Sequence, residues 1–431
     1  MRAALVNPGW DFEGSIYFGC REPHLPIEFG YARALLERSG HEALIIDCRL
    51  EGLSSGELLK KIALFKPHII VIPTAPTYLF WRCPPPELRV PLAMLDLLRD
   101  SGSILIVVGP HGSSTPHSTL KKTGADYLIR GEFEGVLPAL AEMPRNSWTD
   151  LACVYRQGEP KKTGLPHETD LGCLPAIKWP DPYVLNHSHN HHRFHDSPDA
   201  PGAEIESSRG CPFSCSFCAR ENFRGAYRRR RLAVFLKELD YLIAQGARYF
   251  YFIDEIFFPH PEVIRALAAR KISFGIQTRI DLWSERDMAA LGRAGCVSIE
   301  AGVESITEEG RSRFNKKSAV NSAALENLLC EAKQHVPFVQ ATLLGCPLDR
   351  AAEVAEWRER LIGRGVWANE PVPLFPYPGS AEYRRLWGEP DDSAWERAHS
   401  HYLEENSVFS DIQDSKPFSL PDLERRGADA H

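Results

Sequence analysis

The sequence predicts an α/β protein: a doubly wound parallel sheet, then a partial (β/α)6 barrel and a small C-terminal extension. The chain has 431 residues, too many for one ordinary domain. Short apolar runs alternate with stretches of helical spacing, which is typical of parallel sheets covered by helices. The alternation breaks once, in a stretch rich in Pro, Asp and His. We therefore expect a sheet domain at 1–144, a linker at 145–200, a barrel at 201–385 and an extension at 386–431.

Five strands and five helices are expected in the first third of the chain. The strands are apolar runs that end in turn residues: Ala3–Val6, Ala43–Ile46, His68–Ile72, Ile104–Val108 and Tyr127–Ile129. The helices have periodic apolar positions: Ile27–Ser39, Gly56–Leu64, Leu92–Leu98, Ser118–Thr123 and Glu134–Glu142. Such a Rossmann-like sheet binds its ligands at the carboxyl ends of the strands, where the strand order reverses.

Small and hydroxyl residues follow several of these strands. They let the backbone approach a flat or anionic ligand closely, although ordinary turns between strand and helix have a similar composition. The candidate binding residues in these loops are Thr74, Gly109, His111, Ser113, Gly131 and Glu132. After them comes a connector with a short hairpin expected near Ala152–Arg156. We interpret its five histidines, which could also bind a metal, as part of a solvated segment: His187, His189, His191, His192 and His195.

A second alternation begins at Glu204. The expected strands are Glu204–Ser207, Tyr249–Ile253, Ser273–Gln277, Val297–Ala301, Val339–Leu344 and Glu370–Leu374. The expected helices are Leu232–Gln245, Pro261–Ala269, Glu285–Ala294, Val320–Gln334 and Arg350–Gly363. Six strands with helices between them fit a partial parallel barrel as well as an open sheet.

Composition argues against several classes of protein. The formal net charge of -7 does not indicate a nucleic-acid coat or a binder of anionic membranes. The first residues lack a signal-peptide pattern, and no apolar run approaches the ~20 residues that span a bilayer. We therefore expect a cytoplasmic protein with no nucleic-acid partner and no membrane partner. The odd number of 11 Cys favours free thiols and metal ligands over a disulfide framework.

Three cysteines directly follow the first strand of the second alternation. Cys211, Cys215 and Cys218 have the spacing C-x3-C-x2-C, and thiolates at these intervals can hold three corners of a cubane iron–sulfur cluster. The next cysteine is far along the chain, so one iron would stay open for another ligand. Three core thiols on one helix face are the alternative, but Gly210 and Pro212 disfavour a helix here. A zinc site would need a fourth ligand nearby.

The cysteine motif, with Phe217 before its last member, resembles that of the radical S-adenosylmethionine (SAM) superfamily. The N-terminal third is similar to the cobalamin-binding domain that precedes many radical SAM barrels. Motifs that match are Asn7–Pro8, Glu28–Tyr31, Gly40–Glu42, Val108–His111, Gly131–Glu134, Asp254–Phe257, Gly302–Ser305, Asn315–Lys316, Leu344–Pro347 and Phe375–Ser380. One departure is the absence of an Asp-x-His-x-x-Gly signature after the first strand, where the sequence reads Asn7–Phe12. Many barrel-fused domains that lack this signature bind cobalamin without a protein histidine.

The resemblance implies roles for individual residues. The three cysteines would bind a [4Fe-4S] cluster whose open iron is chelated by SAM, and Phe217 would contact the adenine through its backbone. Glu255 would accept from the SAM amino group, because a carboxylate pairs with an ammonium. Arg279, with Gln277 and Thr278, would contact the substrate or the SAM carboxylate. Glu300 and Glu304 would accept hydrogen bonds from the ribose hydroxyls. Each of these polar residues could instead form an ion pair at the barrel rim.

On the cobalamin side, the resemblance assigns binding to the strand-end residues Thr74, Gly109, His111, Ser113, Gly131 and Glu132. Trp10, Tyr78 and Trp81 are candidates for the lower face of the corrin ring, or for simple packing. The run Arg228–Arg231 could bind a phosphorylated substrate or the cobalamin nucleotide, but a solvated helix entry is the commoner role. The proline-rich loop Cys83–Glu87 is expected to help close the pocket, or to lie on the surface.

The leading functional hypothesis is a cobalamin-dependent methyltransferase. It would act on an unactivated carbon or phosphorus of a small molecule or secondary metabolite through a deoxyadenosyl radical, with an external electron donor such as flavodoxin or ferredoxin. A second hypothesis keeps the radical without the methyl transfer, as in a cyclisation, rearrangement or oxidation. A third is a non-catalytic cobalamin or redox sensor, which would not need Glu255 or the two carboxylates of the fourth barrel strand.

Overall fold

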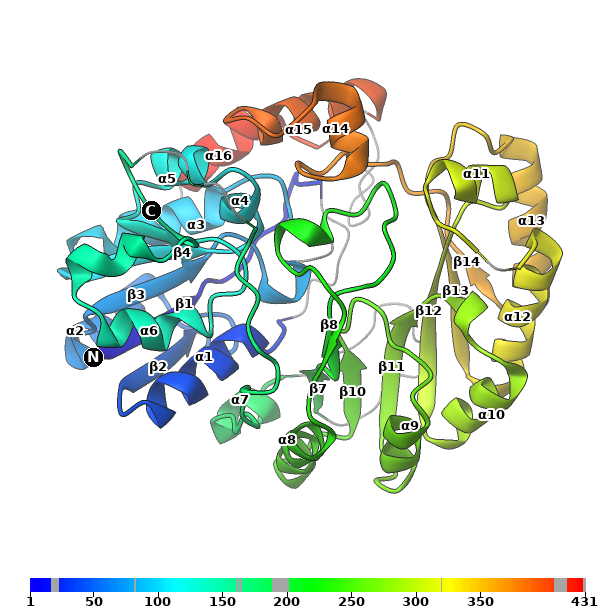
Figure 1. Cartoon of the computed structure of the whole chain (residues 1–431), viewed down its shortest axis with the longest axis horizontal. Coiled ribbons are helices and arrows are strands. Elements are labelled where there is room, and N and C mark those ends of the chain that lie inside the picture. The colour runs from blue at the N-terminus through cyan, green and yellow to red at the C-terminus, as the bar shows by residue number, and fades with distance from the viewer. Residues whose placement is uncertain are drawn as a thin grey trace. The chain divides into compact units, whose positions relative to one another are not determined.

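The structure is a computed structural model. It describes residues 1–16, 23–80, 83–159, 162, 165–187, 201–318, 320–406 and 417–428 (Figure 1). The chain forms two compact units, each with its own six-stranded sheet. The first unit comprises Met1–Asn186, Ala219–Gly225 and Phe375–His431, and the second comprises His187–Cys218 and Ala226–Leu374.

The sheet of the first unit has the strand order β2-β1-β3-β4-β5-β6. Its strands are β1 (Arg2–Asn7), β2 (Glu42–Asp47), β3 (Ile69–Pro73), β4 (Ile104–Val108), β5 (Tyr127–Ile129) and β6 (Val154–Arg156). The first five are parallel, and the order reverses between β1 and β3, so the predicted doubly wound sheet is confirmed. The expected local hairpin near β6 is wrong, because β6 pairs antiparallel with β5 and extends the sheet.

Helices cover both faces of this sheet (Figure 1). They are α1 (Ile27–Arg38), α2 (Ser55–Phe65), α3 (Arg89–Leu98), α4 (Pro110–Ser114), α5 (Pro116–Thr123), α6 (Val136–Glu142) and α7 (Asp181–Leu185). One core cluster joins Val6 and Ile72 of the sheet to Leu58 of α2 and Leu95 of α3. The loop expected after β4 is one helical turn, α4, because Pro110 pre-sets the backbone at a first helical position.

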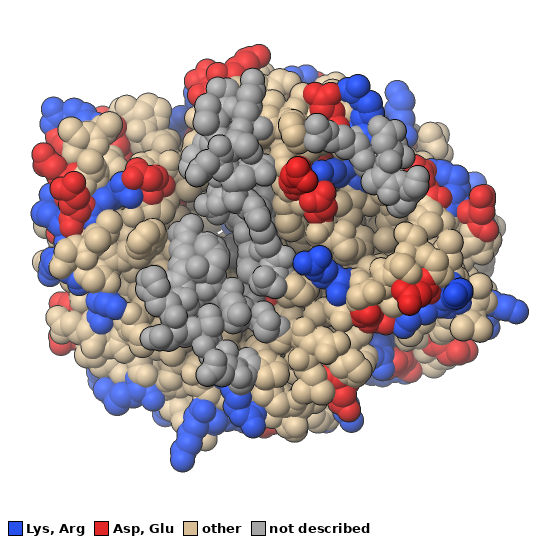
Figure 2. Space-filling view, turned by 180° about the vertical axis from the view of Figure 1, so that it is seen from behind, with Lys and Arg blue, Asp and Glu red and all other residues tan. Residues whose placement is uncertain are grey.

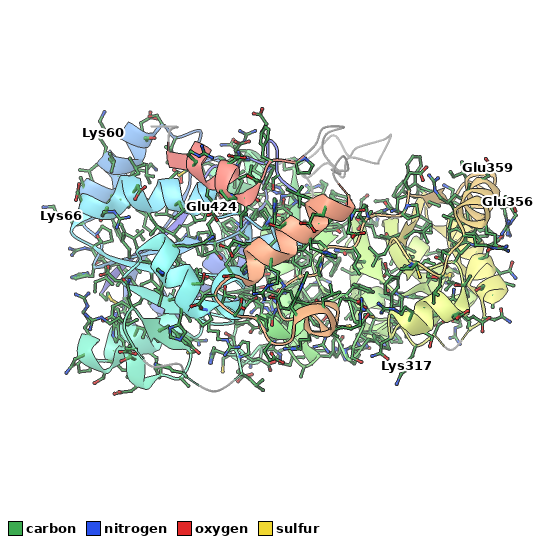
Figure 3. The ribbon with its side chains drawn as sticks, turned by 90° about the horizontal axis from the view of Figure 1, so that it is seen from above. Lys60, Lys66, Lys317, Glu356, Glu359 and Glu424 are labelled. Carbon is green, nitrogen blue, oxygen red and sulfur yellow. The ribbon has the colours of Figure 1, made fainter. Side chains whose placement is uncertain are left out.

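Three C-terminal helices belong to the first unit: α14 (Ala381–Trp387), α15 (Ala394–Glu405) and α16 (Leu420–Ala428). Helix α16 packs on α3. Lys122 of α5 pairs with Glu396 of α15 and, at 3.1 Å, with Glu424 of α16, which Figure 3 labels. Buried aromatic residues of this segment form a second core cluster that includes Phe375, Trp395 and Tyr402.

The sheet of the second unit is the predicted partial barrel. Its strands are β7 (Gly202–Ile205), β10 (Tyr249–Phe252), β11 (Ser273–Thr278), β12 (Cys296–Glu304), β13 (Phe338–Leu343) and β14 (Trp367–Ala368). All are parallel and neighbours in space follow one another in the chain. The last strand was expected at Glu370–Leu374 but forms three residues earlier. Pro371 and Pro373 lack the N–H that a strand needs, so only Val372 pairs there, with Leu344.

Between the barrel strands lie α8 (Leu232–Ala244), α9 (Pro261–Ala268), α10 (Glu285–Arg293), α11 (Glu308–Arg313), α12 (Ser322–His335) and α13 (Ala351–Gly363). Apolar side chains join helices to strands, as where Phe235 of α8 meets Phe252 of β10. Helix α13 buries Trp357 on one face. Its opposite face carries Glu356 and Glu359, which extend outward in Figure 3. Helix α13 is therefore amphipathic, with an apolar side packed against the unit and a charged side in solvent.

His187, at the start of the second unit, is fully buried. Its Nδ1 contacts the carbonyl of Gly202 at 2.6 Å, and its Nε2 contacts the buried carboxylate of Glu204 at 3.1 Å. This histidine therefore anchors the chain to β7, whereas it was expected in a solvated segment. The other four histidines of that segment lie outside the described residues.

The surface is mixed in charge. On the face shown in Figure 2, the described Lys and Arg side chains are interspersed with Asp and Glu. No helix among the described residues combines the length and apolarity that a membrane crossing requires.

Candidate functional site

The three cysteines lie in an irregular loop that directly follows β8 (Ser208–Arg209), which pairs antiparallel with β9 (Arg228–Arg229). All three are half-buried. Gly210 starts the loop with a φ of 78°, a left-handed conformation that favours glycine. The loop is not helical, so three thiols on one helix face are excluded.

Backbone contacts pin this loop to the turn after α11. The Ser216 N–H donates to the carbonyl of Phe314 at 2.8 Å, and Asn315 Nδ2 donates to the carbonyl of Ser214 at 2.7 Å. The rings of Phe217 and Phe314 meet edge to face, with centroids 5.7 Å apart. The loop is thus held at both flanks of Cys215.

Two neighbouring carboxylates after β10 hold the start of the loop. Asp254 is fully buried and accepts from the Ser207 N–H at 3.0 Å, from Ser207 Oγ at 2.7 Å and from Ser208 Oγ at 2.5 Å. Burial raises the pKa of Asp254 to about 7, against the opposing effect of these serine hydrogen bonds. Glu255 Oε2 accepts from the Gly210 N–H at 2.9 Å. Sequence reasoning missed this role of Asp254, although two serines before the motif and a carboxylate at the next strand end were visible signals.

Arg279, at the end of β11, lies over the ring of Phe213 in the cysteine loop, 4.1 Å from its centroid. Asp281 accepts from its Nε at 3.1 Å and from its Nη2 at 2.8 Å. Its Nη1 is buried and has no partner among the described residues. The guanidinium is therefore held in place by Asp281 with one donor left for an anionic ligand.

Polar side chains line up across the barrel strands. Gln277 of β11 pairs in register with Glu300 of β12, which pairs with Gln340 of β13, so the three share one face of the sheet. Tyr251 donates to Glu300 Oε1 at 3.2 Å. Gln277 Nε2 and Gln340 Oε1 are buried without a partner in the described part of the chain. This row offers hydrogen bonds to a polar ligand, and sequence reasoning did not single out Gln340.

Glu304 ends β12 at an irregularity of the strand. It has a φ of 68°, and its Oε1 accepts from Lys316 Nζ at 2.9 Å, with both side chains largely buried. The carboxylate of Glu304 thus already has a cationic partner in Lys316. Its contact with a ribose stays a prediction. Burial raises the pKa of the Cys215 thiol, whereas the nearby cations Lys316 and Arg279 lower it and favour a thiolate.

The cysteine loop fits the cluster that its motif implies. Among the described residues no three His, Cys, Asp or Glu side chains converge on a single metal ion. A cubane cluster does not require such convergence, because each thiolate binds a different iron. Three soft thiols, with Arg279 and Lys316 close to Cys215, supply the donors and the compensating charge.

Four of the six strand-end residues of the first unit come together. Ser113 Oγ donates to the carbonyl of Gly109 at 2.9 Å and accepts from the Gly131 N–H at 2.9 Å. Gly109 has a φ of 119°, and a Cβ there would lie 2.7 Å from Thr74 Oγ1. Thr74 Oγ1 is buried without a partner in the described structure. We call Thr74, Gly109, Ser113 and Gly131 the strand-end cradle.

The other two strand-end residues are covered. Glu132 Oε2 accepts from the Thr169 N–H at 2.7 Å, and both are buried. The His111 ring contacts the Pro86 carbonyl through Nε2 at 3.2 Å and stacks on Trp395, with centroids 4.2 Å apart. Burial lowers the pKa of His111 to about 3, so its imidazole is neutral.

A small pocket of about 30 Å³ lies where β1, β2 and β3 end, which is where the strand order reverses. The rings of His24 and Tyr78 stack in its wall, with centroids 3.6 Å apart, and Trp10 also lines it. Trp10 and Tyr78 therefore line one pocket with aromatic walls, and their contact with a corrin ring stays a prediction. Trp81 lies outside the described residues.

Asp47 lines this pocket as a fully buried carboxylate at the end of β2. It accepts from the Leu50 N–H at 2.8 Å and from Asn7 Nδ2 at 2.7 Å. Burial raises its pKa from 3.8 to about 6, although these hydrogen bonds oppose the rise. The folded-state pKa lies above the ordinary value, so the folded protein prefers the protonated carboxyl of Asp47. The contribution of this preference to the free energy of unfolding is full below pH 3.8 and is lost as the pH rises through 6.

We expect Asp47→Asn to remove this pH dependence, because asparagine keeps the size and one acceptor but cannot ionise. Relative to wild type, the free energy of unfolding of the variant should rise by about 2–3 kcal/mol between pH 4 and pH 7. Denaturant unfolding of both proteins at several pH values measures the difference. If the free energies of unfolding of the two proteins changed with pH in parallel, Asp47 would not have a raised pKa in the folded protein.

Comparison with known proteins agrees with this geometry. Residues 205–356 match the family model described as the Radical SAM superfamily. An uncharacterised methyltransferase of Pyrococcus horikoshii is 24% identical over 400 residues, covering 90% of this chain and 82% of the relative. The anaerobic magnesium-protoporphyrin IX monomethyl ester cyclase of Rubrivivax gelatinosus is 25% identical, covering 76% and 60%. The hopanoid C-3 methylase of Methylococcus capsulatus is 27% identical, covering 83% and 68%.

Two solved structures share the fold over most of the chain. The radical S-adenosylmethionine methyltransferase TsrM from Kitasatospora setae has a TM-score of 0.68 at 16% identity, covering 89% of this chain and 76% of that one. The cobalamin-dependent S-adenosylmethionine radical enzyme OxsB has a TM-score of 0.67 at 17% identity, covering 97% and 64%. The predicted α/β fold class, with two parallel sheets, is therefore confirmed. Residues 205–356, which include the cysteine loop, are therefore a radical SAM domain, and such a domain implies a [4Fe-4S] cluster, SAM and an enzyme.

Proposed function

We propose that this chain is a cobalamin-dependent radical SAM methyltransferase that acts on an unactivated carbon of a small molecule. The observation that carries the proposal is the presence of two prepared sites in one chain. The second unit holds the three-cysteine loop, and the first holds the strand-end cradle beside a pocket with aromatic walls. Relatives named as methyltransferases support the methyl transfer.

In the barrel, each residue has a task that its contacts support. Cys211, Cys215 and Cys218 bind the cluster, which together with SAM supplies one-electron cleavage of a carbon–sulfur bond when bound. Glu255 orders Gly210 and offers its carboxylate to an ammonium group. Arg279 offers its buried Nη1 to a carboxylate.

The row of Gln277, Glu300 and Gln340 offers further hydrogen bonds to a ligand inside the barrel. We propose that Glu300 accepts from ribose hydroxyls, since it is a carboxylate between two neutral amides. Tyr251, which donates to it at 3.2 Å, would fix its orientation.

In the first unit, Thr74, Gly109, Ser113 and Gly131 suit the close approach of a ligand at the strand ends. Gly109 lets the strand ends pack closely, because a Cβ there would lie 2.7 Å from Thr74 Oγ1 and 3.2 Å from the Phe80 ring. Trp10 and Tyr78 present flat apolar faces in the neighbouring pocket. Aromatic walls and small strand-end residues suit contact with a corrin ring, and OxsB, with the same fold, is described with aqua-cobalamin bound.

A second candidate is a radical cyclase that transfers no methyl group. A specific observation favours it: an anaerobic cyclase aligns with 76% of this chain, at an identity similar to that of the methylases. The products made from SAM distinguish the two functions. A methyltransferase converts one SAM to S-adenosylhomocysteine and a second to deoxyadenosine, whereas the cyclase releases deoxyadenosine alone.

The test incubates the anaerobically reconstituted enzyme with SAM and a chemical reductant, with and without hydroxocobalamin. We expect deoxyadenosine under both conditions and S-adenosylhomocysteine only with hydroxocobalamin. Deoxyadenosine without S-adenosylhomocysteine in either condition would exclude the methyltransferase and leave the cyclase. Cys215→Ala serves as the control that separates enzymatic products from spontaneous breakdown of SAM.

A further inference from the structure

The chain passes from the second unit to the first directly after the last cysteine of the motif. Cys218 ends the stretch His187–Cys218 of the second unit, and the residues that follow it, Ala219–Gly225, belong to the first unit. We call Ala219–Gly225 the post-cysteine segment. Because this segment is covalently joined to Cys218, the contacts that fix it also fix one flank of the cysteine loop.

A buried ion pair anchors the post-cysteine segment. Arg224 Nη2 donates to Glu28 Oε1 at 2.8 Å, and both side chains are fully buried. Glu28 lies in the first turn of α1, where the helix dipole favours a negative charge. A buried charge that loses its partner strongly destabilises the fold, so each side chain holds the other in place. The pair therefore ties the segment to a helix that lies far earlier in the chain.

The two residues before Arg224 are held by other parts of the first unit. The Phe223 ring, which is 1% exposed, meets the ring of Phe80 edge to face, with centroids 4.9 Å apart. Asn222 Nδ2 donates to the carbonyl of Pro378 at 2.6 Å. Gly379 has a φ of 90°, and a Cβ there would lie 2.2 Å from Asn222 Oδ1. Three consecutive side chains are thus fixed at three separate places.

Short turns connect Arg224 to the last cysteine. The Arg224 N–H donates to the carbonyl of Arg220 at 2.7 Å, and the Asn222 N–H donates to the carbonyl of Ala219 at 3.0 Å. The Cys218 N–H donates to the carbonyl of Cys215 at 3.1 Å. The backbone between Cys218 and Arg224 is therefore compact and hydrogen-bonded. A change in the place of Arg224 would be passed on to Cys218.

The position of Cys218 matters because each thiolate of a cubane cluster binds a different iron. The contacts with the barrel that were described above flank Cys211 and Cys215. The contacts of the post-cysteine segment follow Cys218, and they come from the first unit. The two ends of the cysteine loop are thus held by different units of the chain.

We infer that Arg224, held by Glu28, is a positioning residue for Cys218. The pair gives the first unit a part in setting the geometry of the cluster, although Glu28 lies outside the matched radical SAM domain. This inference rests on the cluster that the domain implies and not on cobalamin. It therefore applies to the methyltransferase and to the cyclase alike.

The test uses the anaerobically reconstituted full-length protein. Arg224→Met removes the charge at similar length, and Glu28→Gln removes the charge of the partner at the same size. We expect both changes to shift the g values of the reduced, SAM-bound cluster in electron paramagnetic resonance. Chelation of its iron by bathophenanthroline disulfonate should become about tenfold faster, a small part of the effect that breaking a buried ion pair can have. Arg224→Lys keeps the charge without the planar fork and should lie between.

The matched control is Leu95→Ala, which removes a fully buried core side chain from α3. It should lower the melting temperature of the first unit but leave the g values and the chelation rate as in wild type. Such a result would separate positioning of Cys218 from general loss of stability.

The other outcomes decide against the inference or against its basis. If Arg224→Met and Glu28→Gln depart from wild type no further than Leu95→Ala does, the pair only stabilises the first unit and the inference is wrong. If thermal unfolding shows that these two variants are misfolded, the g values of Arg224→Lys decide. A wild-type protein without a cluster would contradict the radical SAM assignment and this inference with it. A wild-type protein that binds no hydroxocobalamin would contradict the proposed function alone.

Discussion

Replacing Cys211, Cys215 or Cys218 by alanine is expected to abolish cluster binding and SAM cleavage. Three thiolates leave no redundancy, because a cluster bound by two protein ligands exposes a second iron to solvent. Each variant should fall from about four irons per chain to background after anaerobic reconstitution, and deoxyadenosine formation should fall with it. The protein should stay folded, since these side chains are half-buried in a loop held by other contacts.

The matched control is Cys173→Ala, which removes an exposed thiol from the first unit. It should leave the iron content and the yield of deoxyadenosine unchanged. A single alanine variant of the loop that kept about four irons would show that its cysteine is not a ligand. Circular dichroism of each variant distinguishes loss of the cluster from loss of the fold.

Asp254→Ala is expected to have the second-largest effect. The change leaves three buried or half-buried donors of Ser207 and Ser208 without their acceptor, at a cost of about 1–3 kcal/mol each. Because these serines directly precede the cysteine loop, iron retention should fall together with the melting temperature. Asp254→Asn keeps one acceptor oxygen and should lie between alanine and wild type.

Iron retention on dilution, measured by the decay of the cluster absorbance, tests this role. Asp287→Ala is the control, because Asp287 also accepts from a serine, Ser284, but at an exposed helix start. It should leave the decay rate unchanged. If Asp254→Ala retained iron as wild type does, Asp254 would have only a structural part in the barrel.

Much of the fold could be predicted because its strands are buried on both faces. Apolar runs such as Ile104–Val108 coincide with a strand of the structure, and helix boundaries fall within a few residues of the predicted ones. The elements that were not predicted are either very short or depend on contacts between distant parts of the chain. Helix α4 has five residues, too few for a periodic pattern, and the pairing of β6 with β5 links residues well apart in the chain.

Some features of the candidate site could likewise be predicted from local sequence, whereas others depend on the folded chain. The spacing of three cysteines is a local signal, and so are the glycines at the strand ends. The contact of Asp254 with Ser207, by contrast, depends on the barrel bringing two strand ends together. The stack of Trp395 on His111 likewise depends on the return of the C-terminal segment to the first unit, which no local pattern specifies.

The central claim is that one chain holds an iron–sulfur cluster and a cobalamin. The most direct measurement is the iron, sulfide and corrin content of the protein after anaerobic reconstitution with iron, sulfide and hydroxocobalamin. The account predicts about four irons and one corrin per chain, with only the iron lost in Cys215→Ala. Four irons without corrin would leave a radical SAM enzyme but contradict the methyltransferase, and corrin without iron would contradict the assignment of the cysteine loop.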